Sequence, residues 1–123
     1  MQAGGVERRA HALQLWADIR ERSQEAISQE FRKGAADCNA AMNQYLWDGE
    51  WYARGITDDD VVFGTQADTE GRIFLNPQSW ALLSNAADPI RTEKLLASVD
   101  AHLMSPHGAA LLGTINEDGP EII

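Results

Sequence analysis

Apolar residues recur every three or four positions through the first third of the chain, which is the pattern of amphipathic helices. The clearest stretch, residues 23–46, predicts a helix with one apolar face. A weaker pattern predicts a preceding helix from Val6 to about Arg22, and it leaves open whether Ser23 caps a new helix or one long helix continues. The apolar face of the longer helix comprises Ile27, Phe31, Ala35, Cys38, Met42 and Tyr45.

The shorter first helix is expected to pack through one face, because its charged residues lie mostly away from that face. Two consecutive glycines precede it, so residues 1–5 are predicted to be flexible. The packed face is expected to contain Leu13, Trp16 and Ala17.

Helical periodicity stops at the segment Trp47–Trp80, which is rich in aromatic and acidic residues. Short β-like runs within it predict a two-stranded excursion around the turn Asp58–Asp60. A connection longer than about 12–15 residues is usually functional or disordered, and the aromatic content argues against disorder. The β-like runs are Trp51–Ile56, Val61–Phe63 and Arg72–Leu75.

Two further helices are predicted from their start signals. Asn76 before Pro77, and Asp88 before Pro89, each place a capping residue before a proline suited to the first helical turn. The last helix should bury Ile90, Leu95, Leu96, Val99 and Leu103.

The patterns together predict a mainly α fold of four helices, with the β excursion between the second and third. The length suits one domain, so residues 1–123 are expected to form a single unit, with residues from about 113 to 123 flexible.

Charge and cysteine content narrow the functional classes. The formal net charge of −9 argues against nucleic-acid partners and anionic membrane surfaces, which favour clustered Lys and Arg. Cys38 is the only cysteine, and the N-terminus lacks the apolar core of a signal peptide. No apolar run is long enough for a bilayer. A cytoplasmic protein is therefore expected.

Candidate binding residues concentrate in the aromatic and acidic segment. Indole rings can stack on the apolar faces of sugars, although large aromatic residues are more often core. Asp48 and Glu50 lie among these aromatic residues, so a structural role and a role in a site are both open for them, whereas Asp58–Asp60 are interpreted as a solvated turn. Arg54 can bind an anionic group or pair with neighbouring acids. The candidate substrate-binding residues are Trp47, Asp48, Glu50, Trp51, Arg54, Gln78 and Trp80.

No residue is assigned a catalytic role from its context. The three histidines, His11, His102 and His107, lack metal-ligand spacing, so no metal site is expected. The sequence contains no glycine-rich phosphate loop and no recognisable nucleophile, and Asn76 is interpreted as a plain helix cap. No cofactor is predicted.

The runs WDGEWYARGITDDD, FGT and EGRIFLNPQSWALLS resemble the inverting disaccharide phosphorylases of the cellobiose and chitobiose phosphorylase family, glycoside hydrolase family 94. The resemblance covers residues 25–112. Within the family, these runs are most similar to members that act on cellobionic acid. It implies part of an (α/α) barrel, and a parent activity that cleaves β-glucosides with inorganic phosphate as co-substrate.

The family's general acid lies in a Gly-Asp-Trp-Asn-Asp motif before this region and its phosphate ligands follow it, and the chain contains neither. The resemblance therefore implies that this chain alone is inactive, and that it dimerises or associates with the rest of a barrel around a β-linked disaccharide or sugar acid. The alternative function is a non-enzymatic carbohydrate-binding or interaction module that uses Trp47, Trp51 and Trp80. Whether the isolated chain is an enzyme stays open here.

Overall fold

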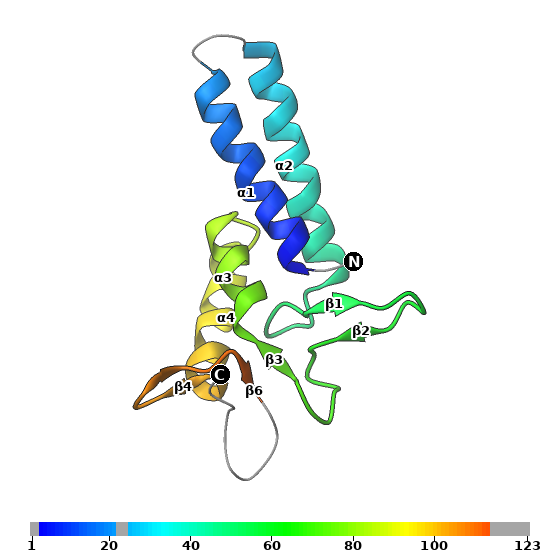
Figure 1. Ribbon diagram of the computed structural model, residues 1–123, viewed down its shortest axis with the longest axis vertical. Helices are drawn as coiled ribbons and strands as arrows, with labels where there is room; N and C mark the ends of the chain where they lie inside the picture. The colour runs from blue at the N-terminus through cyan, green and yellow to red at the C-terminus, as the bar shows by residue number, and fades with distance from the viewer. Residues whose placement is uncertain (1–2, 22–24, 114–123) are drawn as a thin grey trace.

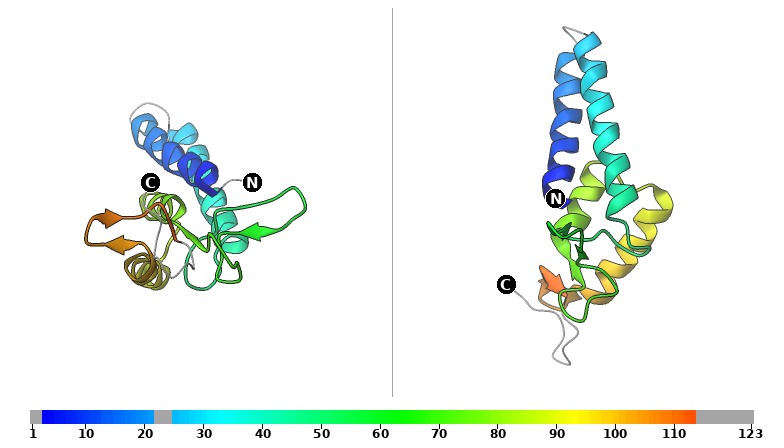
Figure 2. Two further views of the ribbon diagram at one scale, coloured as in Figure 1. Left: turned by 60° about the horizontal axis from the view of Figure 1, so that its bottom comes forward. Right: turned by 90° about the vertical axis from the view of Figure 1, so that its right-hand side faces the viewer.

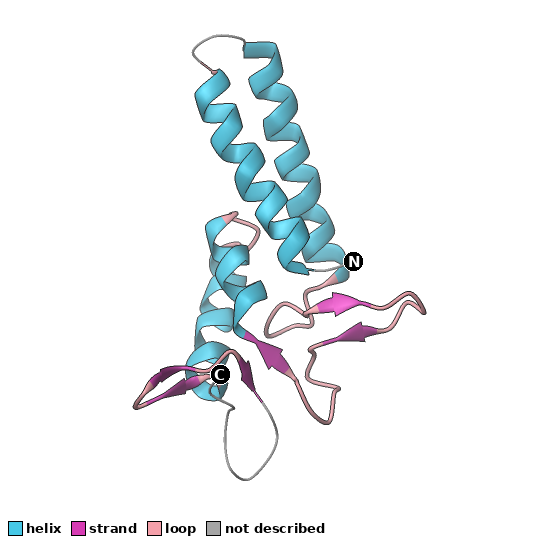
Figure 3. Cartoon of the chain, viewed as in Figure 1, coloured by secondary structure: helices cyan, strands magenta, loops and turns pink. Residues whose placement is uncertain are grey.

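The computed structural model of the protein describes residues 3–21 and 25–113. Its described part contains four helices and three short antiparallel strand pairs (Figures 1 and 3). The order of elements is α1 (Ala3–Arg20), α2 (Glu25–Tyr45), β1 (Gly55–Ile56), β2 (Val62–Phe63), β3 (Ile73–Phe74), α3 (Leu75–Leu83), α4 (Pro89–His102), β4 (Met104–Ser105), β5 (Gly108–Ala109) and β6 (Leu112–Gly113).

Helices α1 and α2 form an antiparallel hairpin whose outer half projects beyond the remaining elements (Figures 1 and 2). Small buried side chains, Ala10, Ala17 and Ala35, allow the two helices to approach closely. The Ser28 hydroxyl donates to the Ala17 carbonyl oxygen at 2.8 Å and ties the helices together near the outer end. The predicted cap Ser23 lies outside the described residues.

The face that α1 buries matches the predicted one in part: Ala17 is buried and Leu13 is half-buried against Gly34 of α2. Trp16 was expected in the packed face, but it is 52% exposed, so that prediction is wrong. The buried positions of α1 are Gly4, Glu7, Ala10 and Ala17, because these lie against α2 and, in the lower half of the helix, against α3. The helix also begins at Ala3, three residues before the expected start.

The two proline-containing helix starts have different outcomes. Asp88 caps α4 as predicted, since its Oδ1 accepts a hydrogen bond from the Arg91 backbone N–H at 2.8 Å. Helix α3 begins near the predicted position, but its N-cap residue is Phe74 and no side chain caps it. The interpretation of Asn76 as a plain cap is therefore wrong, and its amide remains available for another partner.

The strand pairs are shorter and more widely distributed than the sequence indicates. β1 and β2 form the predicted hairpin, with Gly55 opposite Phe63. β3 was expected in the same excursion, but it pairs with β6, with Ile73 opposite Gly113. β4 and β5 form a further hairpin that the sequence analysis did not predict. The chain after α4 thus returns to the start of α3.

The core joins the aromatic segment to the helices. Tyr52 and Trp51, with exposed fractions of 0% and 3%, belong to two adjoining clusters. Leu95 in α4 and Leu103 at its C-cap are buried as predicted. Ile90 and Leu96 were also expected to be buried, but they are 71% and 51% exposed. The members are Met42, Leu46, Tyr52, Ala53, Ala81, Ala86 and Leu95 in one cluster and Trp51, Ile73, Leu103 and Ala110 in the other.

Several large apolar side chains remain exposed outside this core. On α1, Leu15, Trp16 and Ile19 are each at least half exposed. Helices with apolar residues on two faces are typical of elements that pack on two sides. Residues 3–21 and 25–113 form a mainly helical, partial structure and no closed barrel, which confirms the predicted fold class.

Candidate functional site

A cavity beside the aromatic segment lies at the start of α3. Its volume is about 380 Å³, within the range of small-molecule sites. It combines one cation and two neutral polar side chains with an aromatic and aliphatic wall. Its lining residues are Arg54, Phe74, Leu75, Asn76, Ser79 and Leu111, and we call this cavity the Arg54 pocket.

Backbone contacts fix the position of Arg54. Its N–H donates to the Phe63 carbonyl oxygen at 2.9 Å, which continues the β1–β2 pairing by one residue. Gly64 follows with a φ of +79°, and a methyl group at its Cα would lie 2.7 Å from the Arg54 nitrogen. Only glycine therefore allows this approach. The Arg54 guanidinium carbon then lies 5.9 Å from the centre of the Phe74 ring.

The guanidinium of Arg54 has no carboxylate within ion-pair distance among the described residues. The alternative prediction, that Arg54 forms an ion pair with a neighbouring acid, is therefore wrong for the described residues. The exposed Asn76 amide can both donate and accept hydrogen bonds. The Ser79 hydroxyl donates to the Leu75 carbonyl oxygen at 3.3 Å, so its oxygen can still accept a hydrogen bond.

Glu7 lies behind this site on α1 and was not recognised from the sequence. It is fully buried, and neither carboxyl oxygen has a hydrogen-bond partner within the described structure. Burial raises its pKa to about 9, while the nearby charges of Arg54 and Arg8 oppose that rise. The side chain is therefore neutral near pH 7. Its spacing with Gly4 and Ala10, small residues on the same helix face, is the sequence signal that marks it as buried.

The first turn of α1 also borders the pocket. A methyl group on Gly4 would lie 3.6 Å from Nδ2 of Asn76 and 3.7 Å from Nη1 of Arg54. The starts of α1 and α3 and the segment before β1 therefore converge on one place, although they are far apart in the sequence (Figure 1).

Gln78 is fully committed to the fold. Its amide accepts from the Tyr52 N–H at 2.9 Å and donates to the carbonyl oxygens of Tyr52 and Phe74 at 2.7 and 3.0 Å. Because the residue is only 1% exposed, these bonds attach the aromatic segment to α3 in a dry environment. Direct contact of Gln78 with a ligand stays a prediction, and the structure gives this side chain a positioning role.

Trp51 is likewise an internal residue. Its Nε1–H is shared between the carbonyl oxygens of Gly64 and Arg72, at 3.0 and 2.9 Å. Its ring contacts the edge of His102 with centroids 5.4 Å apart. With 3% of its surface exposed, the indole has no free face for stacking on a sugar in this structure.

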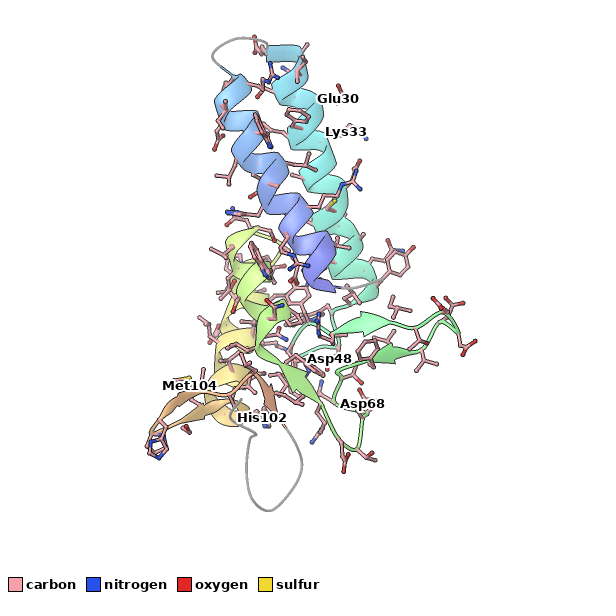
Figure 4. All side chains as sticks on the ribbon, viewed as in Figure 1. Glu30, Lys33, Asp48, Asp68, His102 and Met104 are labelled. Atoms are coloured by element: carbon pink, nitrogen blue, oxygen red, sulfur yellow. The ribbon has the colours of Figure 1, made fainter. Side chains whose placement is uncertain are left out.

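Asp48 organises the turn that follows α2. Its Oδ1 accepts the backbone N–H groups of Glu50 and Trp51 at 2.8 and 2.9 Å, and its Oδ2 accepts that of Gln66 at 3.0 Å. Glu50 lies 3.8 Å from the Lys94 ammonium in a half-exposed pair. Figure 4 shows Asp48 in the lower part of the molecule, far from Glu30 and Lys33 on the outer half of α2.

Trp47 and Trp80 are the candidate indoles with accessible surface, and they make different contacts. Trp47 meets the Tyr52 ring edge-on at 4.9 Å and lies under the Arg91 guanidinium at 5.7 Å. It borders two shallow cavities of about 350 and 270 Å³. Trp80 packs against the His11 ring at 5.9 Å.

Within residues 3–21 and 25–113, no group of three or more His, Cys, Asp and Glu side chains is placed to hold a metal ion. In the same part of the chain, no helix is both long and apolar enough to cross a membrane.

Comparison with known proteins gives a family match and several curated relatives. The model of the glycosyl hydrolase 94 superfamily catalytic domain matches residues 9–117. Cellobionic acid phosphorylase of Neurospora crassa is 52% identical over 105 residues, which are 85% of this chain and 13% of that protein. A 3-O-β-D-glucopyranosyl-β-D-glucuronide phosphorylase of Paenibacillus borealis is 46% identical over 58% of this chain and 9% of its own length.

An N,N'-diacetylchitobiose phosphorylase of Vibrio proteolyticus is 39% identical over 68% of this chain and 11% of its own length. The chain thus spans less than a seventh of each of these three curated relatives.

Proposed function

Since a model of the glycosyl hydrolase 94 superfamily catalytic domain matches residues 9–117, the chain belongs to this family, and we propose that it forms part of a domain that cleaves β-glycosides with inorganic phosphate. The observation that carries the proposal is the 52% identity with a cellobionic acid phosphorylase over 85% of the chain. The named relatives described above are all phosphorylases of β-linked sugars or sugar acids.

The chain by itself is proposed to be inactive. The Arg54 pocket provides a cation, an amide and a hydroxyl, but no pair of carboxyl groups from the described part of the chain lines it to act as acid and base. The uncovered apolar side chains Leu15, Trp16 and Ile19 support a further proposal, that this chain works in association with the rest of a barrel. The compartment proposed for this work is the cytoplasm, in keeping with the unpaired Cys38.

An assay of phosphorolysis tests the claim of inactivity. The purified chain is incubated with inorganic phosphate and either cellobiose or cellobionic acid, and formation of glucose 1-phosphate is measured. No product is expected, whereas the Neurospora crassa enzyme assayed alongside should form it from cellobionic acid. Turnover by the chain alone would contradict the proposal.

A second assay tests the association. The Neurospora crassa enzyme lacking its matching segment is mixed with this chain, and complex formation is measured by size-exclusion chromatography with light scattering. A stable complex is expected, because each part covers apolar surface of the other. Failure to associate under conditions in which both parts are folded would contradict the proposed role in a larger domain.

The alternative of a carbohydrate-binding module that uses Trp47, Trp51 and Trp80 has less support. Trp51 is buried and both of its acceptors are backbone carbonyl groups, so it cannot join a surface platform without local unfolding. The Arg54 pocket is the better candidate for sugar contact.

A further inference from the structure

Helix α1 has an exposed stripe of side chains along one face. Its members recur at spacings of four, three and four, which places them in one row on a helix. The buried Ala10 and Ala17 lie on the opposite side of the helix, and Leu15 and Ile19 of the stripe are each more than half exposed. A row of this kind is typical of a helix that packs against a further helix. The α1 stripe comprises Arg8, Ala12, Leu15 and Ile19.

Helix α4 has a second exposed stripe, and this one is acidic. Its members recur at spacings of three, four and three, so they also form one row. The buried Leu95 and Ser98 lie on the opposite side of α4, and Ile90 of the stripe is 71% exposed. The α4 stripe comprises Ile90, Glu93, Ala97 and Asp100.

The charged members of the two stripes are opposite in sign and are not neutralised within the described ranges. No ion pair joins Arg8, Glu93 or Asp100 to another described residue. Glu7 precedes Arg8 in the chain, but it is buried and protonated near neutral pH, so it does not cancel the arginine charge. Each stripe therefore combines exposed apolar side chains with a charge that the other stripe can neutralise.

The two stripes of one molecule do not meet. Helix α3 packs against both α1 and α4 and lies between them (Figure 2). Both stripes remain exposed as a result, and the partner of each must come from another chain.

The two stripes match in length and in order. At a rise of about 1.5 Å per residue, the α1 stripe is about 16 Å long and the α4 stripe about 15 Å. An antiparallel alignment places Arg8 opposite Asp100 and, at the other end, Ile19 opposite Ile90. The alanines of the two stripes then lie opposite each other, where small side chains allow two helices to approach closely.

We propose that the α1 stripe of one copy of this chain binds the α4 stripe of a second copy in an antiparallel arrangement. The two contacting surfaces differ, so each bound copy keeps one stripe free for a further copy, and the assembly grows until a ring closes or continues as an open chain. This inference goes beyond the proposed function, because the partner is the same chain and no part of a phosphorylase is needed.

Sedimentation velocity of the full 123-residue chain tests the proposal. The chain is measured at about pH 7 and at concentrations from about 10 μM to 1 mM, which covers the range of weak association. We expect a reversible rise in mass with concentration that continues past the dimer. A monomer at every concentration would overturn the proposal. A rise that stops at the dimer would overturn it as well, because it would indicate a contact between identical surfaces.

Charge reversal identifies the paired surfaces. Arg8→Glu places two acids opposite each other, and Asp100→Arg places two cations opposite each other, so each variant alone should associate at least about tenfold more weakly than the native chain. An equimolar mixture of the two variants should associate like the native chain, because every α1–α4 contact in alternating copies then joins opposite charges. Lys33→Glu on α2 is the control, since it changes the net charge as Arg8→Glu does and should not restore association when mixed with Asp100→Arg.

An apolar substitution on α4 gives an independent test. Ile90→Ser should weaken self-association by about tenfold or more. Leu83→Ser on α3 removes a leucine that is 54% exposed and lies outside both stripes, and it should have no effect. Circular dichroism establishes that each variant is folded, and the serine variants decide the matter if a charge-reversed chain unfolds.

A mixture of the two charge-reversed variants that stays dissociated, or equal effects of Ile90→Ser and Leu83→Ser, would overturn the proposal. These measurements contain this chain alone. The assay with the truncated Neurospora crassa enzyme is a separate experiment, so failure of self-association and failure of the proposed function are distinguishable.

Discussion

The side-chain amide of Gln78 brackets the backbone of Tyr52, since it accepts from the Tyr52 N–H at 2.9 Å and donates to its carbonyl oxygen at 2.7 Å. A neighbouring strand would form hydrogen bonds with the backbone N–H and carbonyl oxygen of a buried residue in the same way. One side chain of α3 therefore replaces a strand for the segment that leads to Arg54.

Replacement of Gln78 should be costly. Gln78→Ala leaves the Tyr52 N–H and carbonyl oxygen buried without partners, and we expect a loss of about 2–4 kcal/mol in the free energy of unfolding. Urea denaturation followed by circular dichroism measures the loss. Gln44→Ala, at an exposed position of α2, is the matched control and should change stability by less than about 0.5 kcal/mol. Equal effects of the two substitutions would contradict the role of the amide.

Glu7 makes stability depend on pH. Burial raises the pKa of the folded state from 4.5 to about 9, so the folded chain holds a proton that the unfolded chain releases between these values. The contribution of this group is fully present below about pH 4.5 and is lost as the pH rises through 9. The facing charges of Arg54 and Arg8 lower the Glu7 pKa and so moderate the effect without reversing it.

We expect the Glu7 contribution to the free energy of unfolding to fall by up to about 1.4 kcal/mol per pH unit over this interval. Thermal unfolding from about pH 5 to 9 measures the slope, and Glu7→Gln, which keeps a neutral side chain at every pH, should flatten it. Glu30→Gln, on the exposed surface of α2, should leave it unchanged. A slope that persists in the Glu7 variant would assign the effect to other groups.

Gly64 sets the geometry beside Arg54. Gly64→Ala introduces a residue at a φ of +79° and a methyl group 2.7 Å from the Arg54 nitrogen, so either the strand pair or the segment before it must move. We expect a loss of stability of at least about 1–3 kcal/mol, together with altered amide shifts at Arg54 and Phe63. Gly108→Ala, also at a positive φ of +124° but with no neighbour within 4 Å, separates backbone strain from the close approach. If both substitutions have the same effect, the close approach is not the cause.

The uncovered face of α1 should matter for assembly and not for folding. Trp16→Ser and Ile19→Ser change side chains that are 52% and 61% exposed, so each should alter the stability of the isolated chain by less than about 1 kcal/mol. In the association assay with the truncated Neurospora crassa enzyme, the double substitution should weaken the complex by about tenfold or more. Gln29→Ala on the exposed side of α2 is the control. Unchanged affinity would show that this face is not the interface.

The sequence predicts the helices well, because their periodicity and start signals are local. Asp88 before Pro89 predicted both the start of α4 and its cap. The sequence could not reveal that β3 pairs with β6, since each strand is two residues long and the paired residues lie 38 and 40 positions apart.

The candidate site was predicted less completely for a different reason. Arg54 was recognised by its chemistry. Gln78 and Trp51 carry polar groups that a ligand site could use, but in the fold these groups form hydrogen bonds with backbone atoms. Glu7 was missed because a single acid beside Arg8 and Arg9 reads as part of a solvated face. Which polar group is left unpaired depends on tertiary packing, and a one-dimensional pattern does not contain it.

The α1–α2 hairpin contacts α3 only along its lower half, so protection of its backbone amides from hydrogen exchange should be graded along its length. We expect amides next to the buried Glu7 and Met42 to open only with the core, and those near Ala17 and Ser28 to open whenever the two helices separate. The far end of the hairpin can therefore adjust its angle without disturbing Arg54, which gives a neighbouring helix freedom to settle before the pocket is affected.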